Sequence, residues 1–179
     1  VTTTNAPTPV TLAATSITAS GAVLNGSTNP NGATSTAWFR YGTTNPGTCS
    51  GTFGTTTTST SLGAGTTAVA HSATVSGLLS GTTYYFCAVG SNAAGTSYGP
   101  VLSFTTAGAP TVTTEAATLV ATTSATLNGT ARPNGLTTSA WFRYSTVNPG
   151  SCTTTFGTAT ATTALGAGTS FVPYSQALT

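Results

Sequence analysis

The sequence predicts an all-β chain of tandem β-sandwich units, the second of them incomplete, and three observations support this prediction. Thr makes up roughly a quarter of the 179 residues, and β-branched side chains favour the pleated, half-exposed surface of a strand. Apolar residues come in short alternating runs, and no segment shows the helical period of about 3.6 residues. The chain also repeats itself at an interval of about 100 residues, the usual length of one β-sandwich.

The internal repeat has an offset of 103 residues. Residues 25–41 read NGSTNPNGATSTAWFRY, and residues 128–144 read NGTARPNGLTTSAWFRY. The same offset relates NPGTC at 45–49 to NPGSC at 148–152. Because the alignment needs no gap, we expect both copies to adopt the same fold.

The repeat also predicts how the chain is divided. We assign residues 1–7 to the tail of a preceding repeat, 8–106 to a first unit, 107–110 to a short linker and 111–179 to a second unit that lacks its last two strands. A sandwich without two strands exposes a core face and a strand edge. We therefore expect either a longer native chain or a neighbouring molecule that completes the second unit.

Alternation and turn residues predict seven strands in the first repeat. They are expected near 8–14, 20–26, 34–41, 55–61, 68–75, 83–91 and 97–105. Residues 29–32 read Asn-Pro-Asn-Gly and predict a turn, because Pro fixes φ and Asn-Gly accepts the left-handed conformation. Seven short strands in one repeat are typical of two packed sheets.

Charged residues are 2% of the chain, and this scarcity excludes several kinds of chemistry. Glu115 is the only carboxylate side chain, so paired-carboxylate catalysis, a multi-carboxylate calcium site and a Ser-His-Asp triad at His71 are excluded. A formal net charge of +2 offers no basic surface for nucleic acid, and no apolar run is long enough to span a membrane. We expect a chain that is not an enzyme and that needs no cofactor or metal.

Residues 78–95 read LLSGTTYYFCAVGSNAAG. This segment resembles the E–F corner, F strand and F–G turn of fibronectin type III domains, in particular the Thr/Gly-rich bacterial kind. AWFRY at 37–41 fits strand C of that family, whereas Ser80 stands where the family usually has Pro. The resemblance covers the first repeat and the second as far as it extends. It implies immunoglobulin-like sandwiches in which the Tyr84 hydroxyl forms the corner hydrogen bond.

Within this resemblance, two cysteines are expected to pair. Cys87 lies on strand F next to strand C, and Cys49 follows strand C. With Tyr84 and Phe86 facing inward, Cys87 faces outward, where Cys49 can reach it; two free thiols are the alternative. Cys152 repeats Cys49 and is expected to be unpaired within this sequence. A disulfide implies an oxidising, extracellular compartment or the cell surface.

The remaining aromatic and charged residues have structural interpretations. His71 is expected as a packed or solvent-facing strand residue. Arg40 and Arg143 are expected to stack as cations on sheet-surface aromatic rings, with a ligand-binding patch as the alternative. Trp38 and Trp141 are expected to anchor the two cores; the alternative, a sugar-stacking platform, would need them exposed.

Two kinds of glycosylation sequence occur. Asn25 and Asn128 begin formal N-glycosylation sequons, but both lie at the end of a predicted strand before a turn. The hydroxyl-rich run contains the candidate O-glycosylation sites Thr55, Thr56, Thr57 and Thr58.

The favoured function is a non-catalytic structural or adhesive repeat of a secreted bacterial surface protein, part of an extracellular stalk, sheath or filament. Its partners would be other copies of itself or neighbouring repeats. Low charge favours side-by-side association, and open strand edges favour completion by a neighbour. The alternative is an accessory spacer of a secreted polysaccharide-degrading enzyme, or a carbohydrate-binding module that presents Tyr85, Tyr98 and Trp38 to surface polysaccharide.

Overall fold

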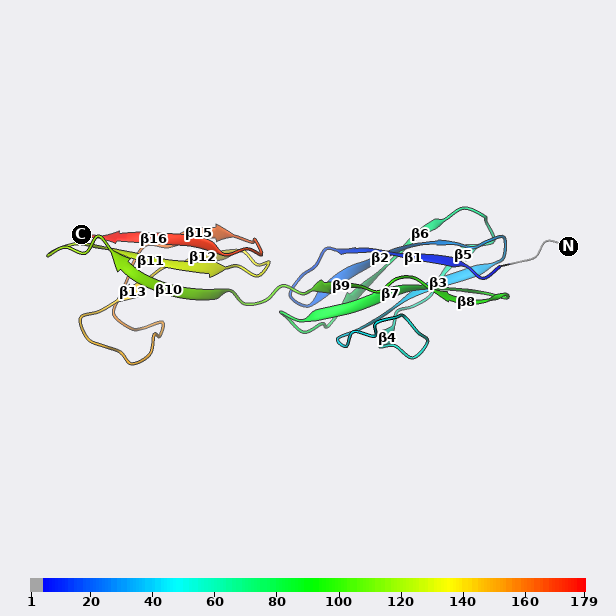
Figure 1. Cartoon of the computed structure of the whole chain (residues 1–179), viewed down its shortest axis with the longest axis horizontal. Helices are drawn as coiled ribbons and strands as arrows, with labels where there is room; N and C mark the ends of the chain where they lie inside the picture. The colour runs from blue at the N-terminus through cyan, green and yellow to red at the C-terminus, as the bar shows by residue number, and fades with distance from the viewer. Residues whose placement is uncertain (1–4) are drawn as a thin grey trace. The chain divides into compact units, whose positions relative to one another are not determined.

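A computed structural model describes residues 5–179, which form two compact units, one ending at Ala107 and the other beginning at Gly108. Both units consist of antiparallel strands and turns, without a helix in the described range (Figure 1). Accordingly, no helix in that range is long and apolar enough to cross a membrane. Residues 1–4 of the predicted N-terminal tail lie outside the described residues. The division between the units falls inside the segment 107–110 that the sequence assigns to a linker.

Unit 1 is built from two antiparallel sheets. One contains three strands in the order β1-β2-β6, and the other follows the order β4-β3-β7-β8, with β5 also on β3 and β9 also on β7. The strands are β1 (Thr8–Thr15), β2 (Gly21–Asn29), β3 (Ser35–Gly42), β4 (Thr55–Thr56), β5 (Thr60–Gly63), β6 (Val69–Ser76), β7 (Thr83–Asn92), β8 (Gly95–Tyr98) and β9 (Leu102–Thr105).

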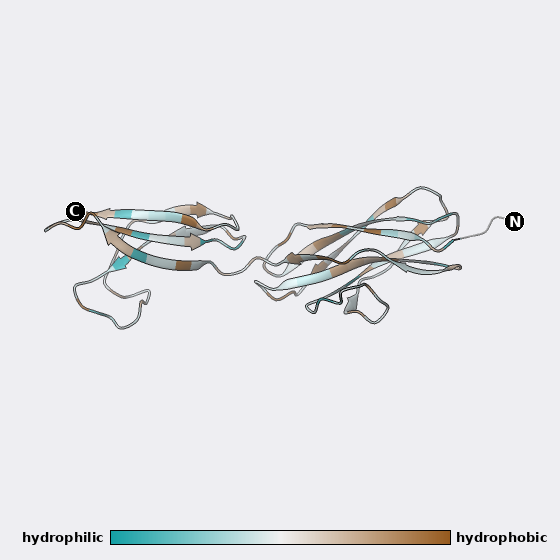
Figure 2. Ribbon diagram, in the orientation of Figure 1, coloured by the Kyte–Doolittle hydropathy of each residue, from teal (hydrophilic) through white to brown (hydrophobic). Residues whose placement is uncertain are grey.

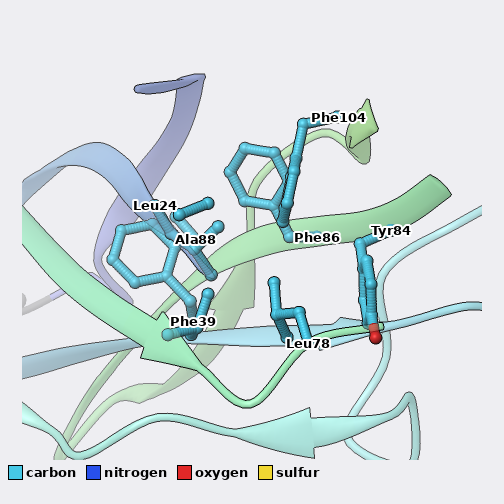
Figure 3. Packing of buried hydrophobic residues seen from close by; sticks show 9 residues of the cluster. Leu24, Phe39, Leu78, Tyr84, Phe86, Ala88 and Phe104 are labelled. Carbon is cyan, nitrogen blue, oxygen red and sulfur yellow. The ribbon is translucent and has the colours of Figure 1, made fainter. Parts of the chain in front are cut away.

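An aromatic core joins the two sheets of unit 1. Figure 3 shows the side chains of Leu24, Phe39, Phe86 and Phe104 meeting in the space between the strands. The rings of Tyr84 and Phe104 are stacked with centroids 5.7 Å apart. Hydrophobic and hydrophilic residues alternate along the strands, as Figure 2 shows. Burying each large apolar side chain stabilises the sandwich by roughly 1.5–3 kcal/mol.

Two predicted strands of unit 1 are interrupted. The strand expected at 55–61 forms two short pieces, and the last strand is divided between β8 and β9 at Gly99-Pro100. Pro100 has no N–H to contribute to a ladder. Beside it the N–H of Gly99 donates to the carbonyl of Ala88 on β7 (2.9 Å), and the N–H of Ala88 donates to the hydroxyl of Thr11 on β1 (2.9 Å). A Cβ atom at Gly99 would lie 2.8 Å from this hydroxyl oxygen, so the interruption requires glycine.

The first described residues of each unit are held by that unit. Asn5–Pro7, which the sequence assigns to a preceding repeat, belong to unit 1: Asn31 donates to the Ala6 carbonyl (2.6 Å), and Pro7 is fully buried. In unit 2 the equivalent Asn134 donates to the Ala109 carbonyl (2.6 Å). Each unit therefore begins with a short segment that is fixed by an asparagine in the turn between the second and third strands of the same unit.

Unit 2 repeats the three-stranded sheet of unit 1 but contains only part of the six-stranded sheet. Its sheets are β10-β11-β16 and the two-stranded pairs β12-β15 and β13-β14. The strands are β10 (Thr111–Thr118), β11 (Ala125–Arg132), β12 (Thr138–Ala140), β13 (Arg143–Tyr144), β14 (Thr158–Ala159), β15 (Thr163–Gly166) and β16 (Val172–Leu178). Strands β12 and β13 stand where unit 1 has β3. Through Thr179, no described strand of unit 2 occupies the place of β7.

The three-stranded sheet of each unit contains a β-bulge at the same place. The pairing of β1 with β2 shifts between Leu12 and Thr15, and that of β10 with β11 shifts between Glu115 and Thr118. An asparagine amide holds each bulge: the Asn25 side chain donates to the Ala13 carbonyl (2.9 Å) and to the Thr15 hydroxyl (3.0 Å), and Asn128 makes the same two bonds in unit 2. These bonds give both sequon asparagines a structural role.

Candidate functional site

A loop between β3 and β4 covers the outer face of the larger sheet in unit 1. The disulfide Cys49–Cys87 ties this loop to β7, with a Cα–Cα distance of 6.2 Å. Cys87 pairs with Arg40 on the face opposite to the core, as expected from the alternation of β7. It is nevertheless fully buried, because the loop lies over it. The disulfide predicted from the sequence is therefore present, and Cys152 is a free, exposed thiol.

An arginine clamps the same loop in each unit. The Arg40 guanidinium donates from Nε to the Phe53 carbonyl and from a terminal nitrogen to the Gly54 carbonyl (3.4 Å). Arg143 donates in the same way to the carbonyls of Phe156 and Gly157. The prediction that these arginines stack on aromatic rings is wrong: within residues 5–179 the cation–π contact joins Arg132 to Phe171, at 6.0 Å.

The tryptophans lie on the outer face of the sheet, which corrects the prediction that they anchor the cores. Phe39 and Phe142, the next residues along the chain, are the buried ones, because successive strand residues point to opposite faces. Trp38 is half-buried, and Trp141 is 45% exposed.

An aromatic strip, defined here as Trp38, Val89 and Tyr98, crosses three strands of this outer face. Trp38 on β3 pairs with Val89 on β7, which pairs with Tyr98 on β8. Two strand spacings separate the two aromatic residues by about 10 Å. Tyr98 is 40% exposed, and Tyr85 lies half-buried on the same face. Val89 in the middle of the strip is fully buried, so the strip offers an outside ligand only the exposed parts of the Trp38 and Tyr98 rings.

A hydroxyl-rich groove runs along one side of unit 1, with a volume of about 460 Å³. It lies between β4–β5 and β6, and its hydroxyl-bearing lining residues are Tyr41, Thr56, Thr57, Thr58, Thr60, Ser72, Thr74 and Ser76. Of the candidate O-glycosylation sites, Thr55, Thr56 and Thr58 are exposed. The Thr57 hydroxyl accepts a hydrogen bond from the N–H of Phe39 (2.9 Å), which gives it a structural role.

His71 is a core residue of unit 1. Its Nε2 lies 3.0 Å from the Thr28 hydroxyl, its ring lies 5.0 Å from that of Phe39, and 8% of its surface is exposed. Burial lowers the pKa of His71 because the charged form loses its hydration. In unit 2 the equivalent Tyr174 stacks on Phe142 at 4.7 Å, and burial raises the pKa of Tyr174. Residues 5–179 contain no group of three or more His, Cys, Asp or Glu side chains that could hold a metal ion.

Tyr84 closes the corner before β7. Its hydroxyl accepts a hydrogen bond from the N–H of Leu79 (3.0 Å). The Thr106 hydroxyl donates to the carbonyl of the same Leu79 (2.6 Å), so both backbone groups of this corner residue are satisfied. The bond expected of Tyr84 is thus formed.

Unit 2 exposes apolar residues that have buried or half-buried equivalents in unit 1. Val112 is 65% exposed and Tyr144 39%, whereas Pro9 is buried and Tyr41 half-buried at the same positions. Leu127 is half-buried, while its equivalent Leu24 is fully buried. Other exposed apolar residues of unit 2 are Leu119, Val120, Leu136, Trp141, Val147 and Phe171.

Two packed antiparallel sheets around an aromatic core define unit 1 as a β-sandwich. No protein-family model matches the chain, and no curated protein matches it. Among solved structures it is similar to the sensor domain of the anti-sigma factor RsgI4 from Pseudobacteroides cellulosolvens in its short form, with 20% identity, a TM-score of 0.45, and coverage of 59% of this chain and 99% of that chain. The long form gives 19% identity, a TM-score of 0.39, and coverage of 64% and 99%. Similarity at this level says nothing about what this chain binds.

Proposed function

We propose that this chain is a non-catalytic, extracellular repeat of a bacterial surface protein and serves as a structural module of a stalk, sheath or filament. The observation that carries the proposal is the repetition of one β architecture along the chain. Both units hold a β-bulge with an asparagine and clamp a loop with an arginine at equivalent positions. Serial repetition of one such unit, with 2% of the residues charged, is what a structural module of an assembly needs.

The topology of unit 1 supports assigning the repeats to the fibronectin type III-like class. Its three-stranded sheet β1-β2-β6 packs on a sheet in which β3 and β7 are central. This arrangement, together with the corner hydrogen bond of Tyr84, is what the sequence resemblance implies for such a domain.

An extracellular location is supported by the disulfide and by the composition. Disulfides such as Cys49–Cys87 persist in oxidising compartments. With 2% of its residues charged, the surface has little charge to oppose close packing of subunits.

Immunogold electron microscopy of intact source cells tests the structural role. Antibodies raised against the purified chain are expected to label a regular extracellular assembly, and labelling should disappear when the antibodies are first incubated with the chain. If the antigen occurs only as free protein in the culture medium, the structural role is wrong.

A carbohydrate-binding accessory module is the second candidate, and the aromatic strip is the observation that favours it. Trp38 and Tyr98 present ring surface on one face, and aromatic faces of this kind can pack against the apolar faces of sugar rings. In affinity electrophoresis with soluble polysaccharides, the chain should be retarded, Tyr98→Ala should reduce the retardation, and Leu79→Ala should not. Leu79 is a matched control because it is exposed (67%) and lies off the strip. Unchanged mobility in every polysaccharide would exclude this function.

A further inference from the structure

We propose that the hydroxyl-rich groove of unit 1 binds a neutral polysaccharide chain. The groove lies between β4–β5 and β6, and its volume of about 460 Å³ is within the usual range of ligand sites. All of its lining residues belong to unit 1, and none of them belongs to the aromatic strip. The proposal therefore goes beyond the structural role proposed above and does not depend on it.

The first argument is the chemistry of the lining. Eight of the ten lining residues are Ser, Thr or Tyr, and none of the ten, all within residues 5–179, is charged. Each hydroxyl can both donate and accept a hydrogen bond, as the hydroxyls of a sugar do. Arg40 pairs with Thr56 in the neighbouring ladder, but its guanidinium donates to the carbonyls of Phe53 and Gly54. The groove thus offers partners to a ligand rich in hydroxyls and no opposite charge to an ionic one.

The second argument is that the apolar residues of the groove are fixed by the core. Val75 is 4% exposed, and Tyr41 and Ala73 pack against the aromatic core. The ring of Tyr41 lies 6.5 Å from that of Tyr84. A sugar ring has C–H groups on its faces and hydroxyls around its edge, so it fits a surface that combines fixed apolar groups with hydroxyls. Because these groups are already ordered, little conformational entropy is lost on binding.

The third argument is the backbone of β6. This strand is at the edge of its sheet, where it pairs with β2 over Val69 to Ser76. Five consecutive residues, 72–76, line the groove, so the strand's backbone faces it as well as its side chains. In an antiparallel ladder every second residue directs its N–H and C=O away from the paired strand, at intervals of about 7 Å. These groups provide further donors and acceptors along the length of an extended ligand.

A comparison of the units shows which groove hydroxyls the fold needs. The hydroxyl of Thr57 accepts a backbone hydrogen bond, and so does that of its equivalent Thr160. Thr56, Thr58 and Thr74 are exposed, and their equivalents at 159, 161 and 177 are all Ala. Nevertheless β14 pairs with β13 in the same register as β4 with β3. The fold therefore does not require these three hydroxyls, which are available to a ligand in unit 1.

An extended peptide is the competing occupant, because β6 is a sheet edge. A peptide that adds a strand needs a continuous edge and pockets for its alternate side chains. The wall opposite β6 is interrupted between β4 and β5, and it presents Thr56, Thr58 and Thr60 to the groove. Hydroxyls on both walls favour a ligand that carries hydroxyls along both of its edges, which a polysaccharide does.

Titration of the 179-residue chain with neutral hexasaccharides of glucose, xylose, mannose and N-acetylglucosamine tests the proposal. Backbone amide shifts are followed by NMR, and affinities are measured by calorimetry. We expect at least one saccharide to produce saturating shifts at residues 56–60 and 72–76. The triple change Thr56→Ala, Thr58→Ala and Thr74→Ala gives unit 1 the residues of unit 2. It should weaken binding at least about tenfold, because three hydrogen bonds to the ligand are lost.

A matched control variant carries Thr55→Ala, Ser59→Ala and Thr67→Ala. These three residues are also exposed but lie outside the groove lining, so the affinity should not change. Equal losses of affinity in the two triple variants would overturn the proposal. So would the absence of saturating shifts with every saccharide at millimolar concentration.

Two further outcomes would assign the binding elsewhere and overturn the proposal. Saccharide-induced shifts confined to the surroundings of Trp38 and Tyr98 would place the glycan on the aromatic strip. Shifts of the groove amides with a synthetic peptide of residues 69–76, but with no saccharide, would identify the ligand as a polypeptide strand. Neither outcome changes the immunogold test of the structural role, so the two proposals fail separately.

Discussion

Units 1 and 2 share most of their local structure and differ in how well their inner faces are covered. In both, an asparagine holds the β-bulge and an arginine clamps the loop. The N–H of Phe39 donates to Thr57 Oγ1 (2.9 Å), and that of Phe142 donates to Thr160 Oγ1 (3.0 Å). Yet β3 is continuous while its equivalent is split into β12 and β13. Local geometry thus follows from the repeated residues themselves, whereas burial and strand continuity in unit 1 depend on β7 to β9.

The two units also fill one core position in different ways. Unit 1 places His71 against the Thr28 hydroxyl, whereas unit 2 places Tyr174 against the ring of Phe142. Both arrangements need a glycine opposite: a Cβ atom would lie 3.0 Å from the His71 ring at Gly26 and 3.2 Å from the Tyr174 ring at Gly129. The position therefore tolerates a polar pair or an aromatic stack, provided that the neighbouring strand leaves space.

The largest expected difference between the units comes from breaking the disulfide. Reduction, or the double change Cys49→Ala with Cys87→Ala, should lower the free energy of unfolding of unit 1 by about 3–4 kcal/mol, because the unfolded chain regains the entropy of the closed loop. Each unit has one tryptophan, so Trp141→Phe and Trp38→Phe variants report the two units separately by fluorescence during urea unfolding. A comparable loss of stability in unit 2 would contradict this account.

The next effect tests the clamped loop, which should respond alike in both units. Gly54 has a φ of +52°, and a Cβ atom there would lie 2.1 Å from the Tyr41 carbonyl oxygen. Gly54→Ala should cost unit 1 about 2–3 kcal/mol, and Gly157→Ala should cost unit 2 a similar amount. Gly47→Ala is the matched control: its φ is +68° but nothing lies within 4 Å, so about 1 kcal/mol is expected. Denaturant midpoints measure all three, and equal losses at Gly47 and Gly54 would show that the close contact is unimportant.

A smaller effect is expected at the corner of unit 1. Tyr84→Phe removes the acceptor of the Leu79 N–H and should lower the unfolding free energy of unit 1 by about 1 kcal/mol. Tyr85→Phe removes a hydroxyl on the outer face of the same strand and serves as its control. In the Trp141→Phe background, the fluorescence of Trp38 reports the unfolding of unit 1. An equal loss of unfolding free energy in the two variants would indicate that the corner bond adds nothing.

The smallest expected effect is a pH dependence of stability that His71 gives to unit 1 alone. Burial holds the pKa of His71 below its ordinary value of 6.5, so the unfolded chain binds more protons than folded unit 1 once the pH falls below that value. The stability of unit 1 should therefore decrease as the pH is lowered from 7 towards 5, and well above its ordinary pKa of 6.5 His71 should contribute no pH dependence. Transplanting the core of unit 2 with Thr28→Ala and His71→Tyr should remove this dependence. Thermal unfolding across this range measures it, and a slope that survives the double change must come from another group.

The strand positions of unit 1 could be predicted because short-range alternation encodes them, whereas the Cys49–Cys87 pairing also needed the family resemblance, which implies that strand F lies beside strand C. Alternation placed the strands, and the register of Tyr84 and Phe86 placed Cys87 on the outer face. The same alternation could not decide which face of AWFRY is buried, because Trp38 and Phe39 are both large and apolar. What covers each face, the other sheet or a loop, is a long-range property.

The arginine clamp was missed for a related reason. Its acceptors lie 13 and 14 residues along the chain, and nothing in the local sequence shows that the loop returns to them. One signal was available: a Phe-Gly pair follows the arginine at the same distance in both repeats, at 53–54 and 156–157. A repeated glycine next to a repeated aromatic residue indicates a close backbone contact, which here is the one with Tyr41.

The disulfide also determines how unit 1 responds to a pulling force. When the sandwich is stretched from its ends, the chain between Cys49 and Cys87 cannot extend, because the covalent bond carries the tension across it. That segment spans 38 residue steps, or roughly 130 Å of contour length at about 3.4 Å per residue. Oxidised unit 1 should therefore lengthen by that much less than reduced unit 1 when it ruptures, so the redox state of one bond sets the extensibility of this part of the chain.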